Sequence, residues 1–160
     1  MKDILVREAR SADRKELSKI FSELLAHHNE ALPEMFRIAG GAPRKKDAIN
    51  FMLSDTSGAL FVAECHGNII GFIDVIIKEP QDTAITARRR YAEVHGVAVT
   101  SRYRRCGAGR LLMEKAEQWA LRQKLAHIEL HVWDFNKGAI AFYQSLGYSV
   151  RSHIMYKPLK

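Results

Sequence analysis

Apolar residues recur along the chain at two different spacings, and each spacing predicts a different kind of element. From Asp13 to His27 they recur every three or four residues, which is the period of one helix face. Asp13 and Glu16 are expected to form a capping box at the start of that helix. Two β-branched runs, Leu60–Glu64 and Ile69–Ile77, flank the turn His66-Gly67-Asn68 and predict a hairpin. The chain therefore combines helices with strands.

The remaining elements follow from the same two patterns and from the residues that begin and end helices. Asn136 and Gly147 stand where the N-cap and the C-cap of the last helix are expected. The predicted strands are Ile4–Arg10, Leu60–Glu64, Ile69–Ile77, Tyr91–Val99, His127–Val132 and Tyr148–Lys157. The predicted helices cover Asp13–His27, about Lys46–Leu53, a long segment after Gly109, and the segment between Asn136 and Gly147. This order, β-α-α-β-β-β-α-β-α-β, predicts an α/β fold in which a mixed sheet carries helices on both faces.

Length and composition are typical of one globular domain. The chain has 160 residues, of which 47% are hydrophobic and 27% are charged, so we expect residues 1–160 to form a single domain with its own core. No apolar run approaches the roughly 20 residues of a membrane span, and the first residues lack a secretory signal. The two cysteines, Cys65 and Cys106, match no zinc motif. We therefore expect a cytoplasmic domain with no metal and no membrane partner.

Basic residues outnumber acidic ones, 25 against 18, which gives a formal net charge of +7. Such an excess attracts nucleic acid, membrane surfaces or phosphorylated small molecules. The arginines gather in two places, at Arg88–Arg90 and around the glycines of the segment Arg102–Arg110. Because the chain carries no helix-turn-helix, zinc-finger or RNA-recognition pattern, a nucleic-acid-binding module is the less favoured interpretation and we expect no nucleic-acid partner.

The segment from Val97 to Arg110 has the pattern of a phosphate-binding turn. A predicted strand ends, two glycines follow at Gly107 and Gly109, and a helix begins. The first N–H groups of a helix have no partner within it, and together with the helix dipole they bind anions. The segment lacks the ending of a nucleotide P-loop and the full dinucleotide-binding spacing. A plain strand-to-helix turn with surface arginines is the structural alternative.

Two motifs in this order resemble the GNAT superfamily of Gcn5-related N-acetyltransferases. The acetyl-CoA loop of that family, Arg/Gln-x-x-Gly-x-Gly/Ala, is matched by Arg104, Gly107 and Gly109. The later strand-Asn-helix-Tyr-x-x-x-Gly-Tyr/Phe pattern is matched by Asn136, Tyr143, Gly147 and Tyr148. The order of elements also resembles the family over essentially the whole chain, which implies a GNAT-like fold.

The resemblance implies acetyl-CoA as a co-substrate and assigns residues to it. Backbone groups of Val97 and Val99 would pair with the pantetheine arm, Asn136 would lie beside that arm, and the hydroxyl of Tyr143 would lie near the sulfur. The pyrophosphate would be bound by the loop opened by Arg104, through the N–H groups of Arg105, Cys106, Gly107, Ala108, Gly109 and Arg110. Tyr143 would then donate a proton to the leaving thiolate, although its helical spacing also suits a side chain that fills the core.

Transfer to an amine needs a base, because a primary amine with a pKa of about 10.4 is mostly protonated at neutral pH. Glu93 and His95 are the candidates, with Glu93 preferred and a water relay left open. Alternation along a strand predicts that both point to the same face as Val97 and Val99. A salt bridge from Glu93 to Arg88 or Arg90, and a core role for His95, are the structural alternatives.

The function expected from this resemblance is an N-acetyltransferase that acts by direct attack in a ternary complex. The acceptor would be a primary amine of a small molecule or peptide, and its pocket would be built by His28–Arg44 and Glu79–Tyr91. Acidic residues, Asp74 among them, favour a cationic acceptor, whereas Arg37 and the arginine run favour an acidic one. A catalytically silent acetyl-CoA sensor is the alternative within the family. A homodimer is possible, but no residue in the sequence points to one directly.

Overall fold

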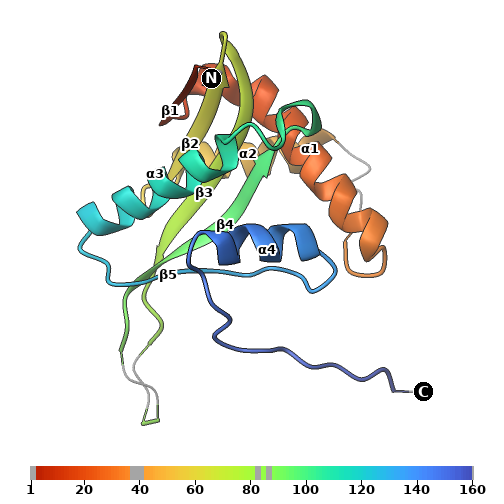
Figure 1. Cartoon of the computed structure of the whole chain (residues 1–160), viewed down its shortest axis with the longest axis vertical. Helices are drawn as coiled ribbons and strands as arrows, with labels where there is room; N and C mark the ends of the chain where they lie inside the picture. Colours follow the sequence, from red (N-terminus) through yellow and green to blue (C-terminus); the bar gives the residue numbers. More distant parts are fainter. Residues whose placement is uncertain (1–2, 37–41, 82–83, 86–87, 160) are drawn as a thin grey trace.

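The computed structural model describes residues 3–36, 42–81, 84–85 and 88–159, and these form one sheet covered by helices (Figure 1). The strands are β1 (Ile4–Glu8), β2 (Gly58–Cys65), β3 (Asn68–Lys78), β4 (Tyr91–Val99) and β5 (Ile128–Leu130). They lie in the order β1-β2-β3-β4-β5, and every neighbouring pair is antiparallel except β4 and β5, which are parallel. The helices are α1 (Arg14–Ala31), α2 (Ala42–Ser54), α3 (Ala108–Arg122) and α4 (Lys137–Ser145), with 3-10 turns η1 (Ser11–Asp13) and η2 (Ser101–Tyr103).

The α/β architecture with helices on both faces of a mixed sheet is confirmed. Leu17 and Ile20 of α1 and Ile49 of α2 pack against one face of the sheet, together with Phe72 of β3. Helix α3 covers the other face, where its buried side chains meet alternate residues of β2, β3 and β4. Helix α4 packs at the edge of this second layer. No helix in the described ranges is long and apolar enough to cross a membrane.

Several elements differ from the sequence-based expectation. Helix α2 begins at Ala42 rather than near Lys46, and α1 continues to Ala31. Strand β5 has only three residues, because it pairs with β4 over residues 92–94 alone. The predicted strand Tyr148–Lys157 is not formed: beyond α4 the described chain has no regular structure.

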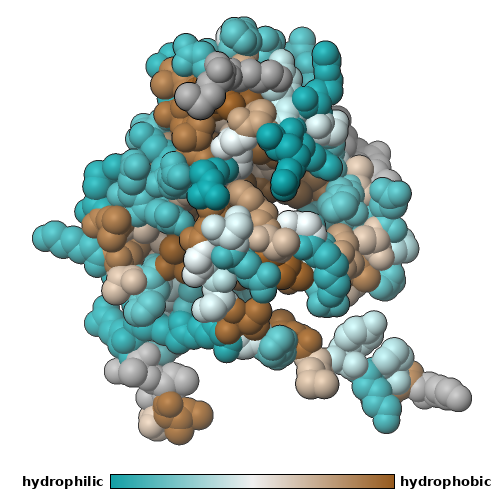
Figure 2. Space-filling view, viewed as in Figure 1, coloured by the Kyte–Doolittle hydropathy of each residue, from teal (hydrophilic) through white to brown (hydrophobic). Residues whose placement is uncertain are grey.

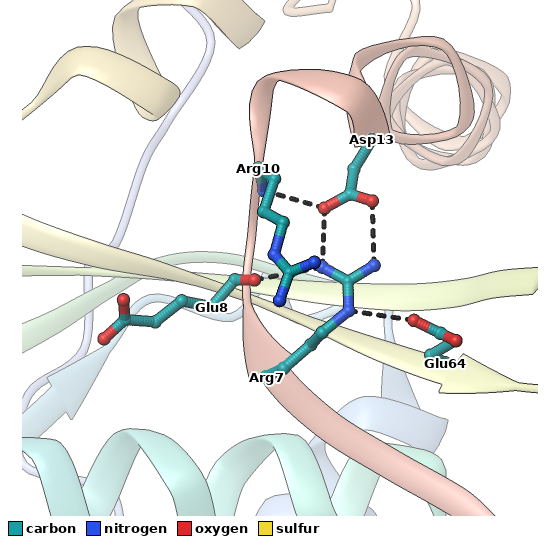
Figure 3. Close-up of polar contacts among 5 residues, drawn as sticks. All are labelled: Arg7, Glu8, Arg10, Asp13 and Glu64. Carbon is teal, nitrogen blue, oxygen red and sulfur yellow. Dashed lines mark hydrogen bonds and ion pairs between the residues drawn. The ribbon is translucent and has the colours of Figure 1, made fainter. Parts of the chain in front are cut away.

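The predicted capping box at the start of α1 is also wrong, because an ion pair uses the Asp13 carboxylate instead. The two terminal guanidinium nitrogens of Arg7 on β1 donate to Asp13, at 2.8 and 2.9 Å, and Arg7 Nε donates to Glu64 of β2 at 2.8 Å (Figure 3). Asp13 also accepts the N–H of Arg10 at 2.7 Å. The Arg7 hydrogen bonds lower the pKa of Asp13. Asp13 therefore fastens the start of α1 to the sheet rather than capping the helix.

Candidate active site

Strand β5, at the edge of the sheet, parts from β4 midway along β4, and this opening is the centre of the candidate site. They pair only at residues 92–94 of β4. Strand β5 then ends at Leu130, whereas β4 continues to Val99. Within the described residues, the edge of β4 that faces away from β3 is therefore unpaired from His95 to Val99.

The backbone groups of Val97 and Val99 point to this open edge. The N–H of Thr100, the next residue, bonds to the carbonyl of Ile70 on the β3 side at 2.9 Å. Because successive residues of a strand direct their backbone groups to opposite edges, Val97 and Val99 direct theirs away from β3. The two residues lie where a bound chain could add to the sheet as a further strand.

The turn into α3 presents a row of free N–H groups beside this edge. Arg105 has a φ of 63° and Gly107 a φ of 93°, and α3 begins at Ala108. In the part of the chain that the structure describes, none of the N–H groups of residues 105–110 donates a hydrogen bond. A Cβ added to Gly107 would meet nothing within 4 Å. The turn therefore has the donors and the open space that a phosphate needs.

The absent side chain of Gly109 serves the packing of two helices. A Cβ at Gly109 would lie 3.3 Å from Cζ of Phe142 on α4, which is closer than most such contacts. The glycine therefore lets α4 pack against the first turn of α3.

The arginine side chains around the turn add positive charge, and no acidic side chain within the described residues neutralises it. Four arginines, Arg102, Arg104, Arg105 and Arg110, are exposed, and no ion pair within the described residues involves them. The Arg104 side chain leans back toward the carbonyl of Val99, with Nε 3.4 Å from the oxygen. The Cys106 thiol donates to the carbonyl of Tyr103 at 2.7 Å. The Cys106 side chain thus helps to hold the turn in its conformation.

Helix α4 brings Asn136 and Tyr143 to the same layer as the turn. The Asn136 side chain accepts the N–H of Ala139 at 3.1 Å, which confirms it as the N-cap. Tyr143, like Val97 and Val99, packs against the buried core beneath α3, and burial raises the pKa of Tyr143 to about 12. Its phenol therefore keeps its proton at physiological pH. No hydrogen bond of the Tyr143 hydroxyl occurs among the described residues.

A β-bulge at His95 overturns the expectation that Glu93, His95, Val97 and Val99 share a face. Asp74 of β3 lies opposite Gly96 and the next residue, Val75, lies opposite Val94, so His95 is an extra residue on β4. Val94 and Val97 both pack under α3, whereas Gly96 faces Phe72 and Leu24 on the α1 side. The alternation therefore shifts at the bulge, and Glu93 faces α1 while Val97 and Val99 face α3.

Glu93 and His95 form a pair on that α1 face. His95 Nε2 lies 2.9 Å from Glu93 Oε1, and His95 Nδ1 lies 4.0 Å from Asp74 Oδ2. The Glu93 side chain is only 13% exposed, whereas that of His95 is 38% exposed, so His95 is the member of the pair that solvent reaches more easily. Lys78 Nζ lies 3.6 Å from Glu93 Oε1.

Glu93 does not form a salt bridge with Arg88 or Arg90, which was the structural alternative for its role. Arg88 and Arg90 both pair with Glu79, and Arg89 pairs with Glu129 of β5.

Asp74 lies behind His95 in an environment that disfavours its charged form. Its side chain is 9% exposed. Burial raises the pKa of Asp74 to about 6, opposed by His95 and assisted by Asp55 at the end of α2. Glu93 and Asp74 thus lie beside the His95 imidazole, and the Asp55 carboxylate interacts with it by charge alone.

Asp74 is expected to make the protein less stable as pH rises. Its pKa is higher in the folded state than the ordinary 3.8, so the folded state holds the proton more tightly. The free energy of unfolding should therefore fall by up to about 3 kcal/mol between pH 3.8 and about 6. Asp74→Asn should remove this part of the slope in denaturant titrations at several pH values. An unchanged slope in the variant would contradict the assignment.

An aromatic cluster closes the α1 side of the opening, and sequence reasoning missed it. The rings of His28 and Phe36 lie 4.9 Å apart, those of Phe36 and Trp133 5.2 Å apart, and those of His27 and Phe135 5.8 Å apart. His27 and His28 lie near the end of α1, one turn after Leu24, which faces Gly96, whereas Trp133 and Phe135 follow β5. The cluster therefore bridges the elements on the two sides of the opening. No pattern in the sequence predicts this cluster, because its residues come from three separate segments.

The other segments expected to line an acceptor pocket are described only in part. Residues 37–41, which include Arg37, and residues 82–83 and 86–87 lie outside the described part of the chain. Elsewhere, no group of three or more His, Cys, Asp or Glu side chains is arranged to hold a metal ion among the described residues. His27 and His28 belong instead to the aromatic cluster.

Residues 20–148 match the Acetyltransferase (GNAT) family. The chain belongs to this family. It is 33% identical over 105 residues to an uncharacterized N-acetyltransferase of Archaeoglobus fulgidus, a match that covers 64% of this chain and 69% of that protein. It is 34% identical over 97 residues to an uncharacterized N-acetyltransferase of Methanocaldococcus jannaschii, covering 61% of this chain but only 41% of that relative. The match thus spans less than half of the second relative.

Solved structures agree with the GNAT fold over nearly the full chain. A variant of the Bacillus halodurans protein BH1408 has a TM-score of 0.90 at 23% identity, covering 98% of this chain and 99% of that one. The aminoglycoside acetyltransferase AAC(6')-Iy, in complex with a CoA-linked bisubstrate analogue, has a TM-score of 0.74 at 14% identity, covering 98% of each chain. At these identities the likeness establishes the fold alone.

Proposed function

We propose that this GNAT protein is an acetyl-CoA-dependent N-acetyltransferase that transfers the acetyl group directly to a primary amine in a ternary complex. The observation that carries the proposal is the row of free N–H groups at residues 105–110, set beside the unpaired edge of β4. A phosphate-binding turn next to an open strand edge suits a ligand that combines a pyrophosphate with an extended amide arm. Coenzyme A has both parts.

The turn before α3, the edge of β4 and the start of α4 each contribute groups that hold acetyl-CoA. The N–H groups of the turn bind the pyrophosphate, and the exposed arginines around it, Arg104 and Arg105 among them, neutralise the remaining phosphate charge. Val97 and Val99 pair with the amides of the pantetheine arm. Asn136 keeps its amide NH₂ free for the same arm, because its oxygen caps α4. The bound thioester supplies the acetyl group.

The Glu93–His95 pair is the base in this proposal. The acceptor ammonium must lose a proton before its nitrogen can attack the thioester carbon. His95 is the more exposed member and receives that proton, directly or through a water. Glu93, 2.9 Å behind it, stabilises the imidazolium that forms. The nitrogen then bonds to the carbonyl carbon, the carbon–sulfur bond breaks, and the second proton that the nitrogen loses goes to the departing thiolate.

Tyr143 acts on the leaving group. The thiolate of coenzyme A resembles that of cysteine, whose ordinary pKa is about 8.5. Burial holds the pKa of Tyr143 at about 12, so its hydroxyl is protonated and available to hydrogen-bond the sulfur as negative charge develops there.

A cationic amine is the acceptor class that the charges favour. The α1 face of the opening carries Asp55, Asp74 and Glu93, and the aromatic cluster beside it offers ring faces to a cation. The described members of the arginine run are engaged by Glu79 and Glu129 and are less available to an acidic acceptor. Polyamines and aminoglycosides have the required chemistry. An aminoglycoside is also the acceptor class in the name of a solved protein of similar fold.

The test is thiol release from acetyl-CoA with three matched sets of primary amines, which carry additional positive charge, no further charge, or carboxylates. We expect turnover to be fastest with the polycationic set and slowest with the acidic set. A preference for acidic amines would overturn the acceptor class. If the protein binds acetyl-CoA but transfers the acetyl group to no amine, the enzyme proposal is overturned and the acetyl-CoA sensor is the remaining interpretation.

Tyr143→Phe is expected to lower kcat about 10²-fold while the KM for acetyl-CoA changes little, because only the proton donor is lost. Tyr148→Phe is the matched control. Its ring lies 6.0 Å from that of Tyr143, but its hydroxyl donates to Glu117 of α3 at 3.0 Å, so that variant should lose about 1 kcal/mol of stability while it keeps the Tyr143 hydroxyl and therefore its kcat. Equal losses of kcat in the two variants would contradict the role of Tyr143.

A further inference from the structure

Asp74 is a buried carboxylate that lacks the hydrogen-bond donors such a group normally has. Figure 2 shows hydrophilic residues spread over the outside of the molecule, where charged groups usually lie. Among the described residues two charged side chains are buried, those of Asp13 and Asp74. Asp13 accepts two hydrogen bonds from Arg7 and one from the N–H of Arg10 (Figure 3). Asp74 accepts none from any described residue. Because a buried carboxylate without donors costs free energy, its place beside the opening points to a ligand that supplies them.

The β4 strand leaves the Asp74 carboxyl group uncovered on the side of His95. Asp74 lies directly opposite Gly96, which has no side chain, and the bulge adds His95 to β4 at this level. A Cβ added to Gly96 would have its nearest neighbours in Phe72, at 3.6 Å, and Leu24, at 4.0 Å. Apolar side chains thus border the space opposite Asp74, and none of them can donate a hydrogen bond to the carboxylate.

The contact between His95 and Glu93 determines which nitrogen of the imidazole is free. His95 Nε2 lies 2.9 Å from Glu93 Oε1, so Nε2 donates its hydrogen to that carboxylate. In a neutral ring the other nitrogen, Nδ1, then has the lone pair. Nδ1 lies 4.0 Å from Asp74 Oδ2, which is too long for a direct hydrogen bond. The nitrogen that can take up a proton and the buried carboxylate therefore face each other across a short gap.

An ammonium group has the size, the charge and the donors that this gap requires. A nitrogen at about 2.8 Å from both atoms, the usual length of a charge-assisted hydrogen bond, spans the 4.0 Å between them. Its two hydrogen bonds then diverge by about 90°, which two N–H groups of one tetrahedral nitrogen reach with slightly bent geometry. Burial raises the pKa of Asp74 to about 6, opposed by His95 and assisted by Asp55. At neutral pH the carboxylate is still mostly charged and attracts a cation.

We propose that Asp74 Oδ2 and His95 Nδ1 together bind the reacting nitrogen of a primary-amine acceptor. This inference rests on the function proposed above, in which His95 is the base, and adds the group that holds the amine while the base acts. One N–H of the ammonium donates to Nδ1 and its proton is transferred there. A second N–H donates to Asp74 and remains on the nitrogen in the amide product. The third proton leaves for the thiolate after the attack on the thioester.

The test is a titration of the protein with butylammonium in the absence of acetyl-CoA, followed through the NMR resonances of the His95 ring. The pH is about 8, above the ordinary pKa of histidine and below that of an alkylamine. Wild-type protein should give saturable shifts. N,N-dimethylbutylammonium has the same charge but a single N–H, so it cannot reach both atoms and should bind at least about 10-fold more weakly.

Asp74→Asn should weaken the binding of butylammonium by about 10- to 100-fold, because a charge-assisted hydrogen bond is lost. Asp55→Asn is the matched control. It removes a carboxylate that also acts on His95 by charge, but the Asp55 oxygen is already engaged by the N–H and the hydroxyl of Ser57, at 2.8 and 2.6 Å. This variant should bind butylammonium nearly as well as wild type does.

Melting curves at the same pH separate a binding role of Asp74 from a structural one. Asp74→Asn removes a buried charge without donors, so the variant should melt no earlier than wild type although it has lost the amine. A variant that melts well below wild type would assign the carboxylate to stability and overturn the proposal.

Two further results would overturn it: equal binding of the primary and the tertiary ammonium, which is the sign of charge attraction alone, and undiminished binding in Asp74→Asn. The titration contains no acetyl-CoA, so the two proposals fail separately. A protein that binds butylammonium as expected but takes up no acetyl-CoA would refute the acetyltransferase alone. A protein that binds acetyl-CoA but shows no saturable response to butylammonium would refute the amine site alone.

Discussion

Gly107→Trp is expected to weaken the binding of acetyl-CoA by at least about 10²-fold. The indole would fill the space next to the free N–H groups of residues 105–110, and several charge-assisted hydrogen bonds to the pyrophosphate would be lost together. The measurement is the rise in melting temperature on addition of acetyl-CoA, which reports binding to the folded state. Wild-type protein should show a clear rise and the variant almost none.

Gly147→Trp is a closely matched control for this experiment. Gly147 has a φ of 92°, against 93° for Gly107, and an added Cβ meets nothing within 4 Å at either site. Both variants therefore carry a similar backbone strain, of about 1–2 kcal/mol. Both should melt earlier than wild type, yet only the Gly147 variant should keep the response to acetyl-CoA. Loss of the response in both would mean that strain, and not the phosphate site, explains the result.

Glu93→Gln and His95→Gln are each expected to lower kcat/KM for the amine by about 10²-fold or more, because each removes one member of the base. Since the two act as one unit, the double variant should be little worse than either single variant. The residual rate should rise with pH, because the supply of neutral amine then depends on the solution. The measurements are pH–rate profiles of thiol release.

Glu129→Gln controls for the loss of a carboxylate at the same level of the sheet. Glu129 lies opposite Glu93 in the pairing of β5 with β4, but its carboxylate is engaged by Arg89 and Arg151. The variant should keep a rate close to that of wild type. Full activity in Glu93→Gln, or additive losses in the double variant, would remove the pair from the mechanism.

The parts of the fold that sequence predicted well are those with a local cause. Strand β4 was expected at Tyr91–Val99 and has those bounds. Asn136 caps α4, and Gly147, with its φ of 92°, follows the end of that helix. In each case the decisive interaction lies within a few residues, so a single stretch of sequence contains it.

The predictions that were wrong concern features that depend on contacts between distant segments. Asp13 is held by Arg7 and so does not cap α1. The bulge at His95 exists only in the register between β3 and β4, and alternation within β4 alone gives no sign of it. The salt bridge from Glu93 to Arg88 or Arg90, which was the structural alternative to a base, does not form because Glu79 binds both arginines.

The same distinction applies to the candidate site. The turn around Gly107 was visible in the sequence because glycine spacing and a helix start are local. The aromatic cluster was not, because His28, Phe36 and Trp133 meet only after α1 and β5 have been placed. The segment after α4 has the alternation of a strand, but pairing needs a second edge, which alternation does not supply.

Calorimetric titration of acetyl-CoA into the wild-type protein tests the central claim most directly. Saturable one-to-one binding with a dissociation constant in the micromolar range, together with much weaker binding of a ligand that lacks the pyrophosphate, is the expected result. A folded protein that takes up no acetyl-CoA would contradict the assignment of the turn at residues 105–110 and the proposed acetyltransferase with it.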